Sequence, residues 1–191
     1  FDKVKGDRIG ADFNDLLISA LINIRDDIHN MPKNNSEFKE SDYKNRAKNF
    51  PLFKGFAAFA YSFSGKFWGG WCRDSAGLRD YVSESFRNAV KQSPRLQGIS
   101  LIHSSYDELT IPFNSIIYCD PPYAGATEYK DKFDHVSFFE WCRNKCKEGH
   151  QVFITEYNAP DDFVCVWQKE IQSGLNVKST KKGIEKLFIH E

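Results

Sequence analysis

The chain has 191 residues, 41% of them hydrophobic and 15% aromatic, and its 26 Lys and Arg equal its 26 Asp and Glu in number. These values are typical of one globular domain with a sizeable core, and they leave room for a small inserted subdomain. They exclude a membrane-spanning protein, because no apolar run approaches the length of a bilayer-crossing helix. We also expect no secretory signal peptide and a cytoplasmic location.

The charged residues are unevenly distributed along the chain. Between Lys39 and Arg95, 11 Lys and Arg stand against 5 Asp and Glu, a net charge of +6. Between Asp107 and Asp162 the numbers are 5 and 11, a net charge of −6. This asymmetry has two interpretations, a DNA-contacting insert joined to an acidic catalytic half or two ordinary solvated surfaces.

The five cysteines form no paired framework in the sequence. Cys142 and Cys146 lie one helical turn apart, as half of a metal site would, but no second pair of ligands accompanies them. We therefore expect buried free thiols and no metal site.

The first predicted elements are a short strand, Arg8-Ile9-Gly10-Ala11, and a helix. Apolar residues recur at helical spacing from Leu16 to Ile28, and Pro32 ends the pattern. Asp12 therefore lies at the carboxyl tip of a strand, just before a helix. An acid at this place either binds the two hydroxyls of a ribose, as in dinucleotide folds, or caps the helix.

The middle of the chain begins with a polar stretch from Asn30 to Phe50, which predicts a loop or linker. The following stretch, Phe50 to Trp71, is dense in aromatic residues and glycine. For most of these rings we predict a small aromatic core, although rings interleaved with basic residues also suit DNA. Lys66 and Arg73 are the candidates for contacts with phosphate.

The remaining pattern alternates helices and strands. We predict a helix that ends near Pro94, strands at Ile99–Ile102, Ile116–Cys119 and Val152–Thr155, a sheet-covering helix over Val136–Cys146, and a late antiparallel pair at Phe163–Trp167 and Ile184–Ile189. Tyr106 follows the first of these strands and either packs or contacts a ligand. Glu156 and Tyr157 follow the strand Val152–Thr155, at the carboxyl edge of the sheet where we expect the functional residues. A basic segment between the last two strands, Lys181-Lys182-Gly183, has two interpretations: it contacts phosphate, or it only faces solvent.

The strand Ile116–Cys119 runs into Asp120-Pro121-Pro122-Tyr123. Its short apolar run predicts a buried parallel strand, and the two prolines end it, so Asp120 is exposed at its carboxyl end. Ligands bind at this edge of open α/β sheets. Because prolines lack amide donors, the nearby carbonyls stay available as acceptors. With the Tyr123 ring beside them, these acceptors suit a planar base that carries an exocyclic amine, and the loop Ala124–Tyr129 is able to close over it.

The sequence Asp120-Pro121-Pro122-Tyr123 resembles the Asp-Pro-Pro-Tyr motif of Dam-like adenine-N6 DNA methyltransferases, which use S-adenosylmethionine. Asp12-Phe13-Asn14-Asp15-Leu16 resembles the second cofactor motif of the same family. The resemblance implies an α/β fold, a Rossmann-like S-adenosylmethionine-dependent methyltransferase sheet with helices on both faces. It also implies a catalytic domain of residues 1–30 and 96–191 and a target-recognition, DNA-binding insert of residues 31–95.

The resemblance also implies the roles of the candidate residues. Asp120, Pro121, Pro122 and Tyr123 would hold a flipped-out adenine, while Asp12, Tyr106 and Asp120 would contact S-adenosylmethionine. Asn14 then becomes the helix cap, and Lys66 and Arg73 lie where the family contacts DNA. The implied activity is site-specific methylation of double-stranded DNA by a monomer, with a cognate restriction endonuclease as a further partner.

The family places a strand and a glycine-rich turn upstream of the acid that corresponds to Asp12. That motif is not among these residues, so we expect the N-terminal part of the catalytic domain to be missing from the sequence. Two alternatives therefore stay open, a catalytically incomplete DNA-binding relic and an amino-group methyltransferase that acts on RNA.

Overall fold

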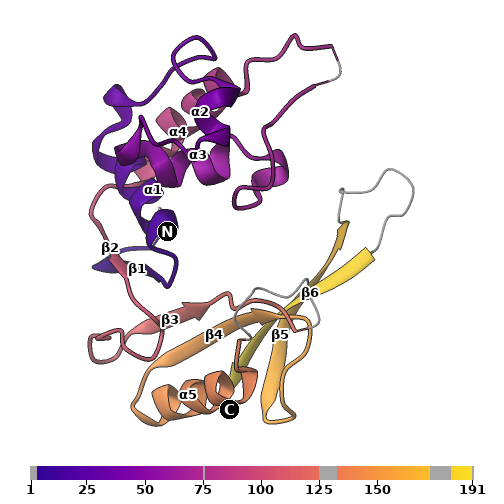
Figure 1. The fold of residues 1–191 in the computed structure, drawn as a ribbon. Helices are drawn as coiled ribbons and strands as arrows, with labels where there is room; N and C mark the ends of the chain where they lie inside the picture. The colour runs from indigo at the N-terminus through magenta and orange to yellow at the C-terminus, as the bar shows by residue number, and fades with distance from the viewer. Residues whose placement is uncertain (1–3, 75, 125–132, 173–181, 191) are drawn as a thin grey trace. The chain divides into compact units, whose positions relative to one another are not determined.

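The computed structural model of the chain describes residues 4–74, 76–124, 133–172 and 182–190. The described backbone is mixed α/β (Figure 1). The strands are β1 (Arg8–Asp12), β2 (Ile99–His103), β3 (Ile116–Cys119), β4 (Gln151–Glu156), β5 (Phe163–Gln172) and β6 (Lys182–His190). The α-helices are α1 (Asp15–Asp26), α2 (Glu40–Lys44), α3 (Lys54–Ala60), α4 (Tyr81–Leu96) and α5 (His135–Lys147), and 3-10 turns lie at Ile28–Asn30, Pro51–Phe53 and Phe63–Gly65.

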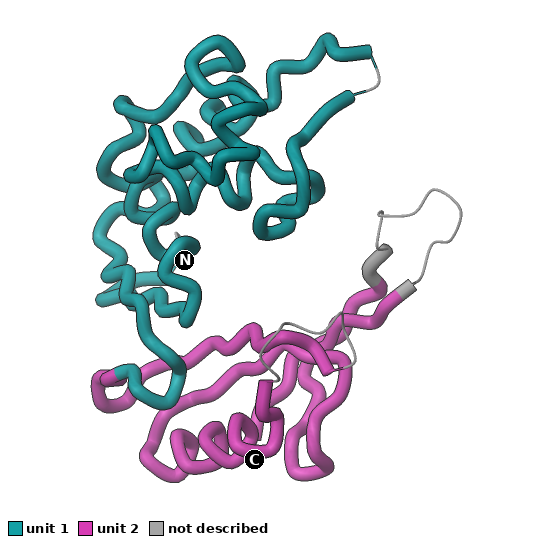
Figure 2. The backbone as a smooth tube through the Cα atoms, viewed as in Figure 1, with its two compact units in different colours: residues 1–109 teal, residues 110–191 magenta. Residues whose placement is uncertain are grey.

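The chain divides into two compact units, residues 1–109 and residues 110–191 (Figure 2). Each unit contains one of the two sheets. Residues 31–95, the predicted insert, belong to the same unit as α1, so this division differs from the boundaries expected from the sequence. The assignment of those residues to target recognition stays a prediction. In the part of the chain that the structure describes, no helix is both long and apolar enough to cross a membrane.

The first unit pairs β1 and β2 in parallel, with a register from Arg8 opposite Ile99 to Asp12 opposite His103. The predicted strand, helix and cap are confirmed here. The Asn14 side-chain oxygen accepts the N–H groups of Leu16 and Leu17, at 3.1 and 3.2 Å, and so caps α1. The helix α4, expected to end near Pro94, contains this proline and continues to Leu96.

The core of the first unit is a cluster of buried aromatic and apolar side chains, which we call the aromatic cluster. It is built from α1, α3, α4 and the loops between them, and its buried aromatic members are Phe38, Tyr43, Phe53, Phe56 and Tyr61. The helices α1 and α3 approach closely at Gly55, where a Cβ would lie 2.1 Å from the carbonyl oxygen of Leu16. The aromatic core predicted between Phe50 and Trp71 is therefore confirmed.

The second unit has the strand order β3-β4-β6-β5, with β3 parallel to β4 and β6 antiparallel to both of its neighbours. The predicted late antiparallel pair is confirmed. The helix α5 covers one face of this sheet through buried Phe138, Phe139 and Cys142. The Phe139 ring packs edge-on against Phe163 of β5 at 5.0 Å, so the helix expected to cover the sheet is confirmed as well.

The strand β3 was expected to be buried, and this expectation is wrong. Ile116 is 70% exposed and Tyr118 is 59% exposed. The neighbouring thiol of Cys119, together with burial, raises the pKa of the Cys142 thiol of α5. Because side chains alternate along a strand, Ile116 and Tyr118 face away from α5. In the described residues β3 is an edge strand with only one covered face.

The cysteines differ from the expectation in their burial. All five are free thiols, but only Cys142 is buried and Cys165 is exposed. Cys165 lies on β5, which is the other edge strand of the four-stranded sheet.

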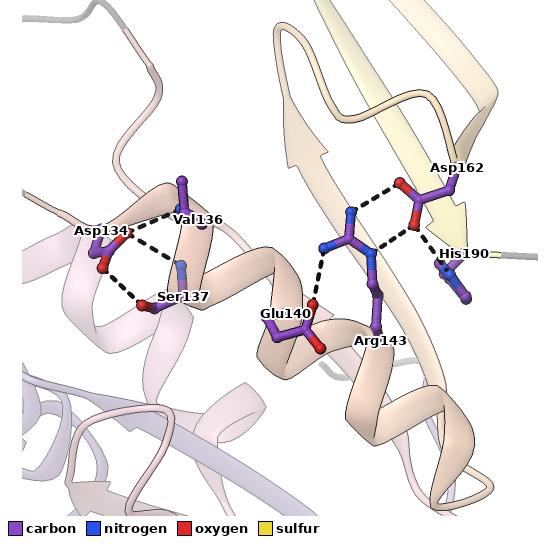
Figure 3. A network of polar contacts seen from close by, with 7 residues as sticks. All are labelled: Asp134, Val136, Ser137, Glu140, Arg143, Asp162 and His190. Atoms are coloured by element: carbon purple, nitrogen blue, oxygen red, sulfur yellow. Dashed lines mark hydrogen bonds and ion pairs between the residues drawn. The ribbon is translucent and has the colours of Figure 1, made fainter.

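The helix α5 is fixed by polar contacts at its start and along its outer side (Figure 3). Asp134 caps its first turn by accepting the N–H groups of Val136 and Ser137, at 3.0 and 3.1 Å. Nearer the C-terminal end, the Arg143 guanidinium donates two hydrogen bonds to Asp162, at 2.6 and 2.8 Å. These contacts hold α5 against the loop before β5 and so fix the helix that follows the Asp-Pro-Pro-Tyr turn.

Candidate functional site

The Asp-Pro-Pro-Tyr turn, Asp120 to Tyr123, begins directly after β3, at the carboxyl end predicted from the sequence. The parallel strand β4 runs beside β3, with Cys119 opposite Ile154, so Thr155 and Glu156 lie at the same edge of the sheet. Figure 1 shows the two strands side by side. Polar side chains from the ends of both strands therefore meet at this turn.

Asp120 is exposed and is oriented by Thr155. The Thr155 Oγ1 hydroxyl lies 2.9 Å from Asp120 Oδ1, its nearer acceptor, and 3.2 Å from the carbonyl oxygen of Cys119, and the Tyr118 hydroxyl lies 3.1 Å from the same Thr155 oxygen. Because Thr155 uses its proton on Asp120, Tyr118 donates to Thr155. Asp120 Oδ2 accepts no hydrogen bond from the described residues, so one carboxylate oxygen is fixed and the other is available.

Tyr123 is half-buried, and its ring is held at two points. Its hydroxyl donates to Glu185 Oε1 at 2.7 Å, and its ring packs edge-on against Tyr157 with 4.7 Å between centroids. Burial, followed by this hydrogen bond to Glu185, raises the pKa of the Tyr123 phenol. The phenol thus stays protonated at neutral pH, and its bond to Glu185 of β6 fixes the ring beside Asp120.

The far side of the turn is held by Glu156 and His135. Glu156 Oε2 accepts the N–H of Ala124 at 3.1 Å, and Oε1 accepts the N–H of Tyr157 at 2.7 Å. His135 Nε2 lies 2.9 Å from the carbonyl oxygen of Pro122 and 3.6 Å from Glu156 Oε2. The residues around Asp120 to Tyr123 therefore come from β4, β6 and the start of α5.

The other predicted ligand site lies in the first unit, at the carboxyl ends of β1 and β2. Asp12 Oδ1 accepts the N–H of Asn14 at 2.7 Å, and Oδ2 accepts no hydrogen bond from the described residues. The next ring, Phe13, is 74% exposed. Tyr106 is partly exposed in the turn after β2. Since Asn14 caps α1, the carboxylate of Asp12 is not needed as the cap.

The positions of these residues indicate which parts of S-adenosylmethionine they could bind. The available Asp12 oxygen suits a ribose hydroxyl, and the exposed Phe13 ring suits stacking on an adenine. The methionine half carries a carboxylate, which glycine-rich turns bind through backbone amides, but no Gly-x-Gly occurs in the 191 residues. Of the residues present, Asp12 and Phe13 are thus those that would hold the adenosine half of the cofactor.

The two predicted DNA contacts differ in what surrounds them. Lys66 is exposed on the tight loop after Phe63, where Ser62 and Trp71 form an isolated antiparallel bridge. The Arg73 side chain is 64% exposed, and its guanidinium forms an ion pair with Glu40. Lys66 is therefore available to a phosphate as it stands, whereas Arg73 would first have to exchange its carboxylate partner.

Two hollows on the described surface lie away from all these residues. One, of about 560 Å³, is lined by Arg25, Gln97 and Gly98, and the other, of about 620 Å³, is lined by Cys146, His150 and His190. Neither contains a predicted site residue. We give more weight to the Asp-Pro-Pro-Tyr turn, because there an exposed carboxylate and an oriented ring stand together.

Sequence reasoning did not assign roles to Thr155, His135 and Glu185. Their partners lie 35, 13 and 62 residues away along the chain, so no local pattern signals the contacts. The position of Glu156 and Tyr157 at the end of a neighbouring strand was the one available signal. Most of the predicted closing loop, residues 125–129, and Lys181 lie outside the described residues; Lys182 and Gly183 begin β6.

No protein-family model matches the chain, and a search of curated proteins finds no match for it.

Proposed function

We propose that the chain is the catalytic part of an S-adenosylmethionine-dependent DNA methyltransferase that acts on N6 of an adenine flipped out of double-stranded DNA. The observation that carries this proposal is the Asp-Pro-Pro-Tyr turn. Asp120 has one carboxylate oxygen fixed by Thr155 and one available, and it lies beside the Tyr123 ring, which Glu185 holds. The Rossmann-like architecture is part of the same proposal and is supported by the parallel pairs β1–β2 and β3–β4.

The chemistry requires acceptors for the exocyclic amine. The N6 lone pair of adenine is delocalised into its ring, so the nitrogen is a poor nucleophile. Asp120 Oδ2 and the Pro121 carbonyl would accept the two N–H groups and draw the nitrogen toward tetrahedral geometry. The Pro121 carbonyl accepts no hydrogen bond from the described part of the chain, whereas that of Pro122 is occupied by His135. When bound, S-adenosylmethionine would supply a methyl group on a positively charged sulfur, and the amine that gains this methyl group would give up one of its N–H protons to solvent on the side of Asp120 Oδ2.

The ring of Tyr123 supports a flipped base. The N6 edge of a paired adenine is not accessible to these acceptors, so the base has to leave the stack. A flat ring beside Asp120 would stack on it, a contact of about 1–3 kcal/mol. Holding the amine at near-attack distance then supplies much of the rate. Lys66 is the proposed contact with the DNA backbone.

A catalytically incomplete DNA-binding protein is the second candidate. It would use the same acceptor on Asp120 and the same Tyr123 ring. In that case the turn would bind a base without methylating it. An RNA methyltransferase would use the same acceptors on an amine of an RNA base.

The test is transfer of a labelled methyl group from S-adenosylmethionine to duplex DNA, to RNA of the same sequence and to a protein acceptor. Hydrolysis of the nucleic acid then identifies the methylated base. Label recovered as N6-methyladenine from DNA is the expected result, and label in RNA alone would favour the RNA enzyme. DNA binding without transfer would favour the incomplete protein. The absence of both DNA binding and methyl transfer would contradict both DNA-directed proposals.

A further inference from the structure

The Asp-Pro-Pro-Tyr turn has few backbone donors of its own. Pro121 and Pro122 lack N–H groups, so between Asp120 and Ala124 only Asp120, Tyr123 and Ala124 carry amide protons. Such a turn cannot be fixed by hydrogen bonds among its own amides. Partners from other elements have to hold it if Asp120 and the Pro121 carbonyl are to keep one geometry.

Glu156 is one such partner. Its side chain is 0% exposed, although it carries a carboxyl group. A buried carboxyl group is costly unless its oxygens are hydrogen-bonded, and both oxygens of Glu156 accept backbone N–H groups. One of these belongs to Ala124, the residue directly after the turn. Glu156 therefore connects the end of the turn to the end of β4.

His135 is the second partner. Its Nε2 lies 2.9 Å from the Pro122 carbonyl oxygen, which can only accept, so this nitrogen carries a proton. The same nitrogen lies 3.6 Å from Glu156 Oε2 and faces this buried oxygen. His135 is the first residue of α5, directly after the cap Asp134, so the helix fixes its position. The turn is thus held by β4 on one side and by α5 on the other.

We infer that Glu156 and His135 are positioning residues that hold the Asp-Pro-Pro-Tyr turn, so that Asp120 and the Pro121 carbonyl keep their acceptor geometry toward the amine of the substrate base. His135 occupies the Pro122 carbonyl, whereas the carbonyl of buried Pro121 accepts no hydrogen bond from the described residues. This inference rests on the proposed methyl transfer. It assigns a role in geometry to two residues that do not touch the base.

The test compares four variants in the full chain. Glu156→Gln retains the size of the side chain but replaces one acceptor by a donor. His135→Ala removes the donor to Pro122, whereas His135→Gln places an amide N–H near the same position. Glu148→Gln is the matched control, because Glu148 is an exposed carboxylate at the other end of α5 that pairs with Lys145.

Two measurements are made on each variant. Steady-state methyl transfer to duplex DNA gives kcat and KM separately, and hydrogen exchange of the Ala124 amide reports on the turn itself. For Glu156→Gln and His135→Ala we expect kcat to fall by about 10²-fold, the loss typical of a misplacement near 1 Å, with KM for DNA little changed. Exchange at Ala124 should accelerate, and His135→Gln should recover most of both losses.

The possible outcomes distinguish a failure of the positioning role from a failure of the proposed methyl transfer. If the wild type transfers methyl groups and both variants retain its kcat, the positioning role is overturned even where exchange at Ala124 has changed. An equal loss in Glu148→Gln would also overturn it, because the effect would then be general to α5. A wild type that transfers no methyl group overturns the proposed function itself, and this inference with it.

Discussion

Two tyrosines, one in each unit, use their rings in different ways. Tyr61 in the aromatic cluster is 0% exposed, and its hydroxyl has no hydrogen-bond partner among the described residues. Tyr123 at the Asp-Pro-Pro-Tyr turn is half-buried, and its hydroxyl donates to Glu185. The first ring fills space among other rings, whereas the second is oriented by a polar contact and keeps part of its surface accessible.

The two tyrosines thus differ in their expected roles: Tyr61 packs in the core, and Tyr123 is proposed to bind a base. In the aromatic cluster Phe38 contacts Phe50 and Tyr61, with ring centroids 4.9 and 4.8 Å away, and such contacts contribute to stability through burial. At the turn Tyr123 has one aromatic neighbour, Tyr157, and its hydroxyl bond to Glu185 fixes its direction. We therefore expect substitutions in the cluster to change the free energy of unfolding and substitutions at the turn to change binding and chemistry.

The largest effect on stability is expected for Phe38→Ala. Phe38 is fully buried among aromatic rings, so its truncation leaves a cavity and should lower the free energy of unfolding by about 3–5 kcal/mol. Urea denaturation followed by tryptophan fluorescence measures this change. Phe113 is 87% exposed, and Phe113→Ala should stay within about 0.5 kcal/mol of the wild type. Equal losses in the two variants would contradict the packing role of the cluster.

Tyr123→Ala should act mainly on the flipped base and lower stability less than Phe38→Ala does. Loss of stacking should weaken binding of an extrahelical base by about 1–3 kcal/mol, and binding of S-adenosylmethionine should persist. The fluorescence of 2-aminopurine at the target position, which rises when the base unstacks, measures this effect. Tyr123→Phe retains the ring but loses the bond to Glu185, so its effect should be smaller. If Tyr123→Ala gave the same 2-aminopurine fluorescence as the wild type, the proposed role of the Tyr123 ring in holding the flipped base would be contradicted.

Tyr61→Phe should stabilise the protein. Removing a buried hydroxyl without a partner abolishes its desolvation penalty, so we expect a gain of about 1 kcal/mol in the free energy of unfolding. Tyr43 is the matched control within the same cluster, because its hydroxyl is hydrogen-bonded to Ser62 and to the N–H of Gly70. Tyr43→Phe should therefore destabilise the protein. Two shifts of the same sign in thermal unfolding would refute the comparison.

The smallest effect is expected at Asp162, outside both regions. Its hydrogen bonds from Arg143 lower the pKa of the Asp162 carboxyl from 3.8 to about 2. Because the folded-state pKa lies below the ordinary value, the contact stabilises the fold above about pH 4 and is lost as the pH falls toward 2. The pair is partly exposed, so solvent screens it. The difference in melting temperature between wild type and Asp162→Asn should shrink over this range; a constant difference would exclude the linkage.

Much of the fold was predictable because its signals are local. The helix cap at Asn14 depends on residues within three positions, and the end of β3 follows from the two prolines after Asp120. The aromatic core followed from the density of rings before Trp71. These features need no knowledge of which strands are neighbours.

The remaining features depend on strand order and on distant partners. Tyr123 meets Glu185 only because β6 lies next to β4, and the periodicity of β6 does not specify that position. The exposure of Ile116 follows from the edge position of β3, whereas its apolar sequence predicted burial. The position of the Asp-Pro-Pro-Tyr turn at the end of β3 was thus predictable, and its supporting contacts required the structure.

The central claim is that Asp120 accepts the amine of a flipped adenine, and Asp120→Ala tests it most directly. The measurement is the amount of N6-methyladenine formed in duplex DNA, together with DNA affinity, for the wild type, for Asp120→Ala and for Asp161→Ala as the matched exposed control. We predict that Asp120→Ala forms no N6-methyladenine while it binds DNA as the wild type does, and that Asp161→Ala is unchanged. Retained methylation in Asp120→Ala would contradict the account.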